Sequence, residues 1–131
     1  MIVPPGFNTV TPYFFARDAE SLVRFLVDGL GGEETCRSMR PDGLIGNVQV
    51  KLGTATVMVS EASARYPAMP AAFYLYVADA DRALQRALEC GATLEMAVSD
   101  MPYGDRQGGV RDPHGNLWWI SQRLVEGPYA P

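Results

Sequence analysis

The feature that most constrains the fold is an internal repeat with a period of 61 residues. When the sequence is shifted against itself by this period, eight identical residues coincide over 51 ungapped positions, where average composition gives about three. The coincident pairs are Tyr13 and Tyr74, Asp18 and Asp79, Ala19 and Ala80, Glu34 and Glu95, Ser38 and Ser99, Pro41 and Pro102, Gly43 and Gly104, and Ser60 and Ser121. The pattern predicts a tandem duplication within one domain of 131 residues.

Both halves show the same order of predicted elements. The predicted strands span residues 10–16, 33–40, 47–52 and a segment after Gly53 in the first half, and 72–78, 93–98, 105–111 and 117–122 in the second. Between the first two strands of each half, apolar residues recur at helical spacing behind a capping residue, Asp18 or Asp79. We therefore expect an α+β fold of two βαβββ modules, about residues 8–60 and 72–124, joined by a Pro-containing linker at 61–71.

Composition excludes several partners. The net charge of -4 leaves little material for the basic face that nucleic acid requires, although it favours a cationic ligand over an anionic one. The apolar runs are far shorter than the ~20 residues of a membrane span, and the first nine residues lack the pattern of a signal peptide. We expect a cytoplasmic protein that binds neither nucleic acid nor membrane. Cys36 and Cys90 lack metal-binding spacing and are predicted to be small buried hydrophobic residues.

Several predicted strands are apolar on both faces, although a sheet covered by a helix on one side usually shows polar residues on the other. The face opposite the predicted helices carries Tyr13, Phe15, Tyr74, Tyr76 and Trp119. One interpretation is a second core layer or a dimer interface. The other is a concave aromatic cavity, in which rings stack on an amphipathic small molecule and a few polar tips orient it.

The repeat, the Asp18 and Asp79 caps and the run from Gly104 to Trp118, which contains Asp-Pro-His-Gly-Asn, resemble the vicinal oxygen chelate superfamily. This superfamily includes glyoxalase I, extradiol dioxygenases and bleomycin-resistance proteins, and the chain looks most like its PhnB-type, bleomycin-resistance-like branch. The resemblance covers about residues 8–124. It implies an eight-stranded, cup-shaped mixed sheet with helices on the outer face, in a homodimer that can exchange modules between chains.

Metal-dependent members of that superfamily carry His, Gln or Glu at four inward positions. The resemblance places these positions on Thr11, Met58, Ala72 and Trp119, none of which is a ligand for a hard metal ion. The chain has one His in total. We therefore expect no metal and no other cofactor.

Polar candidates lie near the expected cup. Tyr103, Asp105 and Arg106 follow the second Pro-x-Gly turn, and because adjacent strand residues point to opposite faces, one of Asp105 and Arg106 is expected to face inward. His114 belongs to a turn and is expected to be solvated rather than catalytic. Glu34 and Glu95 are expected on solvated faces.

Three hypotheses about function follow. The first is a metal-free protein that sequesters an amphipathic, partly aromatic compound, such as an antibiotic or another secondary metabolite. Its ligand-binding residues would be Tyr13, Phe15, Tyr74, Tyr76, Trp119, Tyr103, Asp105 and Arg106, with no catalytic residue. The second is a glyoxalase-like lyase or isomerase, and the third is an aromatic face that serves only as a dimer interface.

Overall fold

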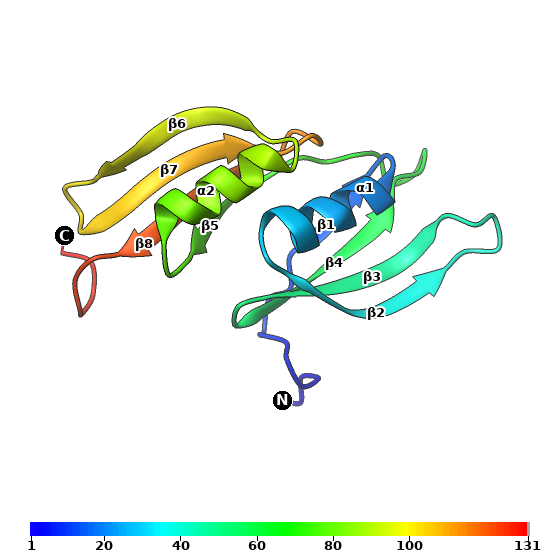
Figure 1. Ribbon diagram of the computed structural model, residues 1–131. Coiled ribbons are helices and arrows are strands. Elements are labelled where there is room, and N and C mark those ends of the chain that lie inside the picture. Colours follow the sequence, from blue (N-terminus) through cyan, green and yellow to red (C-terminus); the bar gives the residue numbers. More distant parts are fainter. Residues whose placement is uncertain (131) are drawn as a thin grey trace. The chain divides into compact units, whose positions relative to one another are not determined.

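The computed structural model describes residues 1–130, which form two compact units, Met1–Pro70 and the segment from Ala71 onward. Each unit contains a four-stranded mixed sheet with a helix packed on one face (Figure 1). The predicted α+β class and the tandem βαβββ modules are confirmed.

The first unit comprises β1 (Tyr13–Ala16), α1 (Ala19–Arg24), its π-helical continuation η1 (Phe25–Gly29), β2 (Glu33–Met39), β3 (Ile45–Leu52) and β4 (Ala55–Glu61). The strands lie in the order β1-β4-β3-β2, with β1 parallel to β4 and the other pairs antiparallel. Glu61 therefore ends β4 and is not part of the linker that the sequence predicted.

The second unit repeats this topology with β5 (Ala72–Tyr76), α2 (Ala80–Glu89), β6 (Thr93–Asp100), β7 (Asp105–Arg111) and β8 (Leu117–Arg123). Its strand order is β5-β8-β7-β6, and β5 runs parallel to β8. The bounds of β7 agree with the prediction, whereas β1 begins three residues later than the predicted strand at 10–16.

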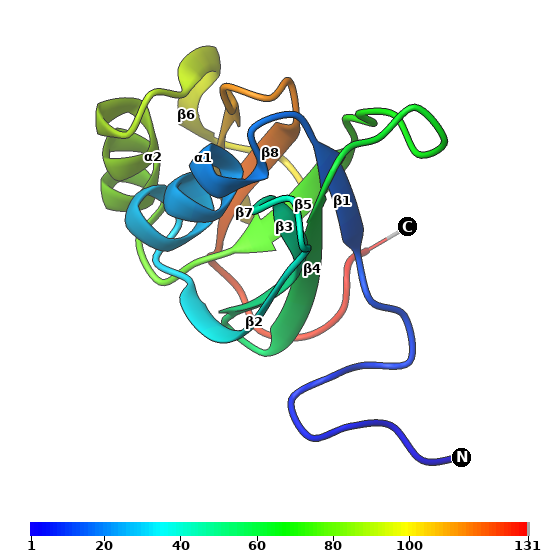
Figure 2. The ribbon, with the colours of Figure 1, turned by 90° about the vertical axis from the view of Figure 1, so that its right-hand side faces the viewer.

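The helix and one sheet face form the core of the first unit (Figure 2). Leu22 and Leu26 are fully buried, as their helical spacing predicts. Phe25 is also buried, at the start of a wider π-turn in which the Leu30 N–H donates to the Phe25 carbonyl at 3.1 Å. The buried sheet residues Val48, Val50 and Val59 complete this core.

The two helices begin in different ways. Asp79 is an N-cap as predicted, since its Oδ1 accepts a hydrogen bond from the Arg82 N–H at 3.1 Å. The corresponding prediction for Asp18 is wrong, because Asp18 adopts a left-handed conformation (φ 55°) and its side chain makes no capping bond. The Glu61 carboxylate, at the end of β4, instead accepts from the N–H groups of Asp18 and Ala19 at 3.0 and 2.9 Å.

The Asp-Pro-His-Gly-Asn turn between β7 and β8 is organised by one buried carboxylate. Asp112 accepts from the N–H groups of His114 and Asn116, from the Asn116 amide and from the Trp118 indole, all at 2.9–3.0 Å. The side-chain Oδ1 of Asn116 in turn accepts from the Ala71 N–H at 3.0 Å and so holds the start of β5. This motif therefore has a structural role, and His114 is half-buried rather than solvated.

Three further expectations are corrected. Cys36 is exposed on the edge strand β2, and Cys90 is half-buried, so neither is a core residue. Glu34 pairs in register with Val50, and the residue in the same register of the second unit is Leu94, which pairs with Val110. Glu95 lies in the bulge that follows, so the two glutamates are not equivalent.

No helix within residues 1–130 is long and apolar enough to cross a membrane.

Candidate functional site

The second unit contains an open pocket of about 520 Å³ lined by Tyr74, Tyr76, Tyr103 and Tyr129. We call it the tyrosine pocket. Tyr74 and Tyr76 lie two residues apart on β5, so both project from the same sheet face, opposite α2. Tyr103 lies in the turn before β7. Tyr129 comes from the C-terminal segment after β8. Each of the four side chains is between 39% and 50% exposed, so the pocket presents accessible rings.

One buried carboxylate organises the tyrosine hydroxyls. Asp105 is fully buried, and its Oδ2 accepts from the hydroxyls of Tyr129 at 2.6 Å, Tyr74 at 3.3 Å and Tyr76 at 3.5 Å. Because these hydroxyls are directed to Asp105, the polar tips bind within the protein and the rings remain as the pocket wall.

Arg123 balances this carboxylate and fixes the C-terminal segment. Its Nη1 lies 3.1 Å from Asp105 Oδ1, and its Nη2 donates to the carbonyls of Gly127 and Pro128 at 3.3 Å. The guanidinium also lies 4.4 Å from the centre of the Tyr129 ring, within the range of a cation–π interaction. Arg123 and Asp105 together therefore place Tyr129 in the pocket.

The environment of Tyr103 and Tyr129 favours the protonated form of these two phenols. Loss of hydration, a hydrogen-bonding contact with Tyr74 and the charge of Asp105 raise the pKa of Tyr103 to about 12. Loss of hydration and the neighbouring Tyr74 also raise the pKa of Tyr129. Tyr103 is further held by Gln107, whose Nε2 donates to Ser121 at 2.7 Å. The site is thus a neutral aromatic surface above an internally paired carboxylate.

Sequence reasoning placed Tyr74, Tyr76, Tyr103 and Asp105 at a ligand site, and the structure brings these four together. It predicted opposite orientations for Asp105 and Arg106, and this is what the structure shows. Arg106 bonds to Asp81 of α2 at 2.7 Å and to Asp100 at 2.9 Å, on the helix side of the sheet. Arg106 therefore does not line the tyrosine pocket.

Trp119 lies beside this group without lining the pocket. It pairs in register with Tyr74 on one side and with Gly109 on the other. Its ring packs over Gly109 so closely that a Cβ there would lie 2.6 Å from Cζ3. The half-buried indole is therefore held by packing against β7.

Tyr13 and Phe15 belong to the first unit and form a separate stack. Their ring centres lie 4.7 Å apart, and Phe15 stacks in turn on Tyr66 at 5.7 Å. The Tyr13 hydroxyl makes a 2.6 Å hydrogen bond with Ser60. Sequence analysis missed Tyr66, because it lies in the segment interpreted as a linker.

Sequence analysis also missed Tyr129 and Arg123. Tyr129 lies beyond the second repeat, where no strand or helix pattern predicts its position. The one signal in the sequence is an aromatic residue next to the turn formers Gly127 and Pro128.

The superfamily that the sequence resembles includes metal enzymes. The side chains at the four corresponding positions decide whether a metal ion could be coordinated here. Met58 lies in register beside Tyr13, and Trp119 beside Tyr74. Neither a thioether nor an indole suits a hard divalent cation, and Thr11 and Ala72 supply no imidazole or carboxylate. Within residues 1–130, no group of three or more His, Cys, Asp or Glu side chains is placed to hold a metal ion. The residues at these four positions do not fit a metal centre.

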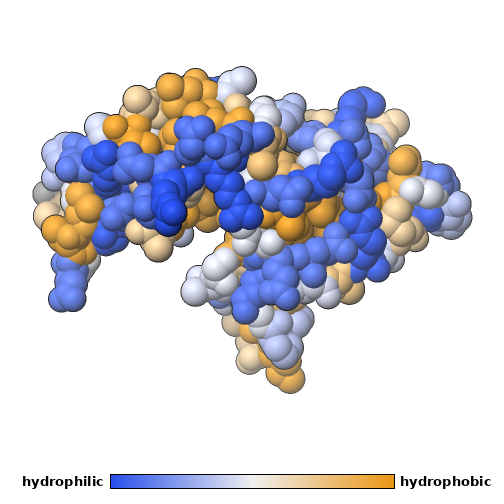
Figure 3. All heavy atoms as spheres, in the orientation of Figure 1, coloured by the Kyte–Doolittle hydropathy of each residue, from blue (hydrophilic) through white to orange (hydrophobic). Residues whose placement is uncertain are grey.

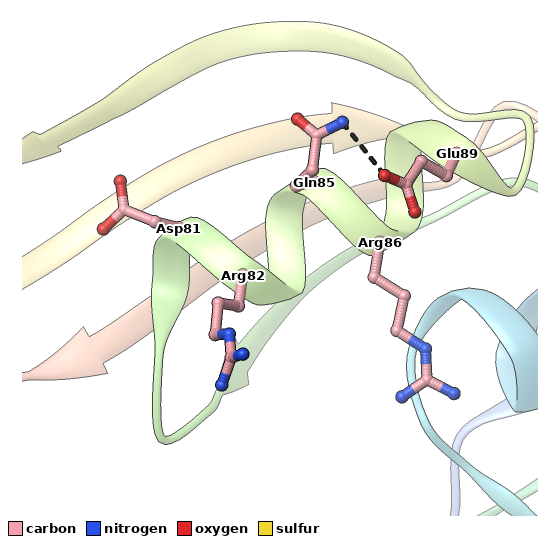
Figure 4. A pocket seen from close by; sticks show the side chains of 5 residues that line it. All are labelled: Asp81, Arg82, Gln85, Arg86 and Glu89. Carbon is pink, nitrogen blue, oxygen red and sulfur yellow. Dashed lines mark hydrogen bonds between the residues drawn. The ribbon is translucent and has the colours of Figure 1, made fainter.

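A second depression of about 370 Å³ lies on the outward face of α2 and is lined by Asp81, Arg82, Gln85, Arg86 and Glu89. Figure 4 shows these side chains along the helix, with the Gln85 amide bonded to Glu89 at 3.3 Å. Hydrophilic side chains cover this surface (Figure 3). Because the residues that line this depression are charged or polar and none is aromatic, the tyrosine pocket is the better candidate for a ligand site.

Comparison with known proteins places this geometry in context. The model of the Glyoxalase/Bleomycin resistance protein/Dioxygenase superfamily matches residues 6–120. The chain is 30% identical over 128 residues to the uncharacterized protein Mb0911c of Mycobacterium bovis, with 89% of this chain and 84% of the relative covered.

Solved structures show the same fold. TioX from a Micromonospora species is 25% identical, with a TM-score of 0.75 over 89% of this chain and 99% of TioX. TnmS3, described as an antibiotic binding protein from a Streptomyces species, is 21% identical, with a TM-score of 0.67 over 88% of this chain and 98% of TnmS3.

Proposed function

Since the chain belongs to the Glyoxalase/Bleomycin resistance protein/Dioxygenase superfamily, we propose that it binds a small amphipathic, partly aromatic compound in the tyrosine pocket. The observation that carries this proposal is the arrangement of four tyrosines around one buried carboxylate. A volume of about 520 Å³ falls within the range of small-molecule sites.

The internal hydrogen bonds support stacking as the mode of binding. Because three hydroxyls are directed to Asp105, a ligand meets ring surfaces that are held in place before it arrives. Fixed rings lose little conformational entropy on binding, which favours affinity. A flat or partly aromatic ligand gains most from such a surface.

The class of ligand that we propose is an antibiotic or another secondary metabolite, sequestered without a metal or chemical conversion. TnmS3 is described as an antibiotic binding protein and shares the fold. The four unsuitable metal positions favour sequestration over the glyoxalase-like alternative. Trp119, in register beside Tyr74, is proposed as a further ligand contact of the second unit, and Tyr13 and Phe15 as ligand contacts of the first.

We also propose that the chain is one domain of two modules, about residues 8–60 and 72–124, that acts as a cytoplasmic homodimer, with module exchange as one form of the dimer. The aromatic stack and the tyrosine pocket give each unit an exposed aromatic surface. Light scattering after gel filtration tests this assembly, and a monomer of 14.3 kDa at micromolar concentration would contradict it.

The binding proposal is tested by calorimetric titration with bleomycin and doxorubicin, two amphipathic antibiotics with aromatic parts. We expect saturable binding of at least one, with a raised melting temperature. Tyr76→Ala should weaken that binding by about 1 to 2 kcal/mol, since a stacking ring is lost. Leu94→Ala, which removes an exposed apolar side chain of the same unit, should not.

Two results would contradict the proposal. Equal affinity for Tyr76→Ala and the parent protein would mean that the ligand binds elsewhere. Product formation from a bound compound would support the glyoxalase-like alternative instead.

A further inference from the structure

We infer that the tyrosine pocket selects a soft organic cation, such as an alkylated ammonium group on an aromatic body, over a neutral compound of the same shape. This inference rests on the proposed function, because it names the chemical class that the same pocket takes.

The rings carry the first part of the argument. The face of a phenol ring is electron-rich and attracts a cation within about 6 Å of its centre. Tyr74, Tyr76 and Tyr129 each donate a hydroxyl proton to Asp105, and donation to a carboxylate pushes electron density back into the ring. The pocket wall is therefore more attractive to a cation than unpaired tyrosines would be.

The hydroxyl arrangement selects the kind of cation. A primary ammonium carries three donors. When it leaves water, the hydrogen bonds that it loses must be replaced by acceptors in the site. The hydroxyls that line the pocket are directed to Asp105 or, for Tyr103, to Gln107. An alkylated ammonium is weakly hydrated and needs contact with ring faces rather than acceptors, so it suits this wall.

Charge in the surroundings points the same way. The Arg123 guanidinium lies 4.4 Å from the centre of the Tyr129 ring, so a cation–π contact is present within the cluster itself. Its own charge is paired with Asp105 at 3.1 Å, so the pair adds no net positive charge beneath the pocket. The segment from Ala71 onward carries eight acidic side chains against five arginines, and this excess favours a cationic ligand.

Two probes of the same shape test the inference. The first is 3-hydroxyphenyltrimethylammonium, and the second is 3-tert-butylphenol, in which carbon replaces the charged nitrogen. Titration followed by calorimetry or by proton NMR should give an affinity about five- to tenfold higher for the cation. The preference should persist at high salt, because contact with a ring is screened less than interaction between distant charges.

The outcomes separate this inference from the proposed function. Equal or tighter binding of 3-tert-butylphenol would overturn selection of a cation and leave aromatic binding in place. Saturable binding of neither probe, together with no binding of either antibiotic, would overturn both.

Three variants assign the preference to the rings. Tyr129→Leu removes one ring from the C-terminal segment, outside the strands and helices, and should reduce the preference to about twofold or less. Tyr129→Phe keeps the ring and should retain most of it. Asp81→Asn removes a negative charge on the helix side and should leave the preference unchanged. A preference lost in Asp81→Asn but kept in Tyr129→Leu would attribute selection to net charge and overturn the inference, while melting temperatures confirm that each variant is folded.

Discussion

Leu44 and Asp105 occupy the same backbone position in the two units, directly after the turn between the second and third strands. In the first unit the Arg40 N–H donates to the Leu44 carbonyl at 2.7 Å, and in the second the Met101 N–H donates to that of Asp105 at 2.8 Å. The side chains differ completely, since Leu44 is 44% exposed and Asp105 is fully buried. The same backbone turn therefore carries an exposed apolar side chain in the first unit and a buried carboxylate in the second.

The partners of these positions explain the difference. Tyr13 in the first unit corresponds to Tyr74 and bonds to Ser60, whereas Tyr74 bonds to Asp105. Phe15 corresponds to Tyr76 but has no hydroxyl to donate. The second unit therefore has tyrosine donors where it has a carboxylate acceptor. Units of the same topology therefore differ in the polar groups that their equivalent positions carry.

The largest expected effect comes from importing the first unit's residue into the second. Asp105→Leu should lower the free energy of unfolding by about 3 to 5 kcal/mol, because it leaves Arg123 and three tyrosine hydroxyls without their acceptor. The reciprocal change Leu44→Asp, at an exposed position, should change it by less than about 0.5 kcal/mol. Urea denaturation measures both. Similar costs for the two variants would show that Asp105 does not organise the second unit.

Some parts of the fold and of the candidate site could be predicted from the sequence, and others could not. The repeat and the period-two alternation predicted the modules and the shared face of Tyr74 and Tyr76, since these depend on local order, while the second Pro-x-Gly turn pointed to Tyr103 and Asp105. The roles of Glu61 and Tyr129 depend on contacts across 42 and 24 residues, to Ala19 and Asp105. Contacts of that kind leave no periodic signal in a single sequence.

The π-turn is a second example. Residues in register are 61 apart in β1 and β5, as Tyr13 and Tyr74 show, but 60 apart where β2 and β6 begin, as Glu33 and Thr93 show. The first unit holds one more residue between these strands, and the helix that connects them contains the π-turn at Phe25–Gly29. An ungapped comparison cannot reveal this shift, and it produced the mistaken pairing of Glu34 with Glu95.

The next effect concerns how closely each helix approaches its sheet. Gly108 in β7 has the register position of the buried Val48 in β3. A Cβ at Gly108 would collide with Leu84 of α2 and lie 2.9 Å from Val98 Cγ2. Gly108→Ala should therefore lower the free energy of unfolding by about 1 to 3 kcal/mol.

A double variant checks the cause of this loss. In Gly108→Ala with Leu84→Ala, the free-energy loss should be smaller than the sum of the two single losses, because the truncated side chain leaves room for the new methyl group. Strict additivity would instead point to the backbone of β7 as the source.

A smaller effect distinguishes the helix starts. The Glu61 carboxylate accepts from two N–H groups at the start of α1, whereas its counterpart Gln122 accepts from the Ala80 N–H alone, at 3.0 Å. Glu61→Ala should cost about 1 kcal/mol in the free energy of unfolding. Gln122→Ala should cost less, because Asp79 still caps α2. An equal loss in both variants would show that the two caps do not differ in strength.

The smallest effect appears only in alkaline solution and tests the second unit alone. The pKa of Tyr103 is raised to about 12 in the folded protein from its ordinary value of 10.0, so the folded state holds the phenol proton more tightly than the unfolded state. The resulting stability is fully present below about pH 10 and is lost as the pH rises toward 12. Urea denaturation between pH 8 and about 11.5 should show this decline, and Tyr103→Phe should make it shallower, leaving the part due to Tyr129, while also losing the bond to Gln107. If the decline is as steep in Tyr103→Phe as in the parent protein, the alkaline loss arises from other groups and the shielding of this phenol does not contribute to the stability of the tyrosine pocket.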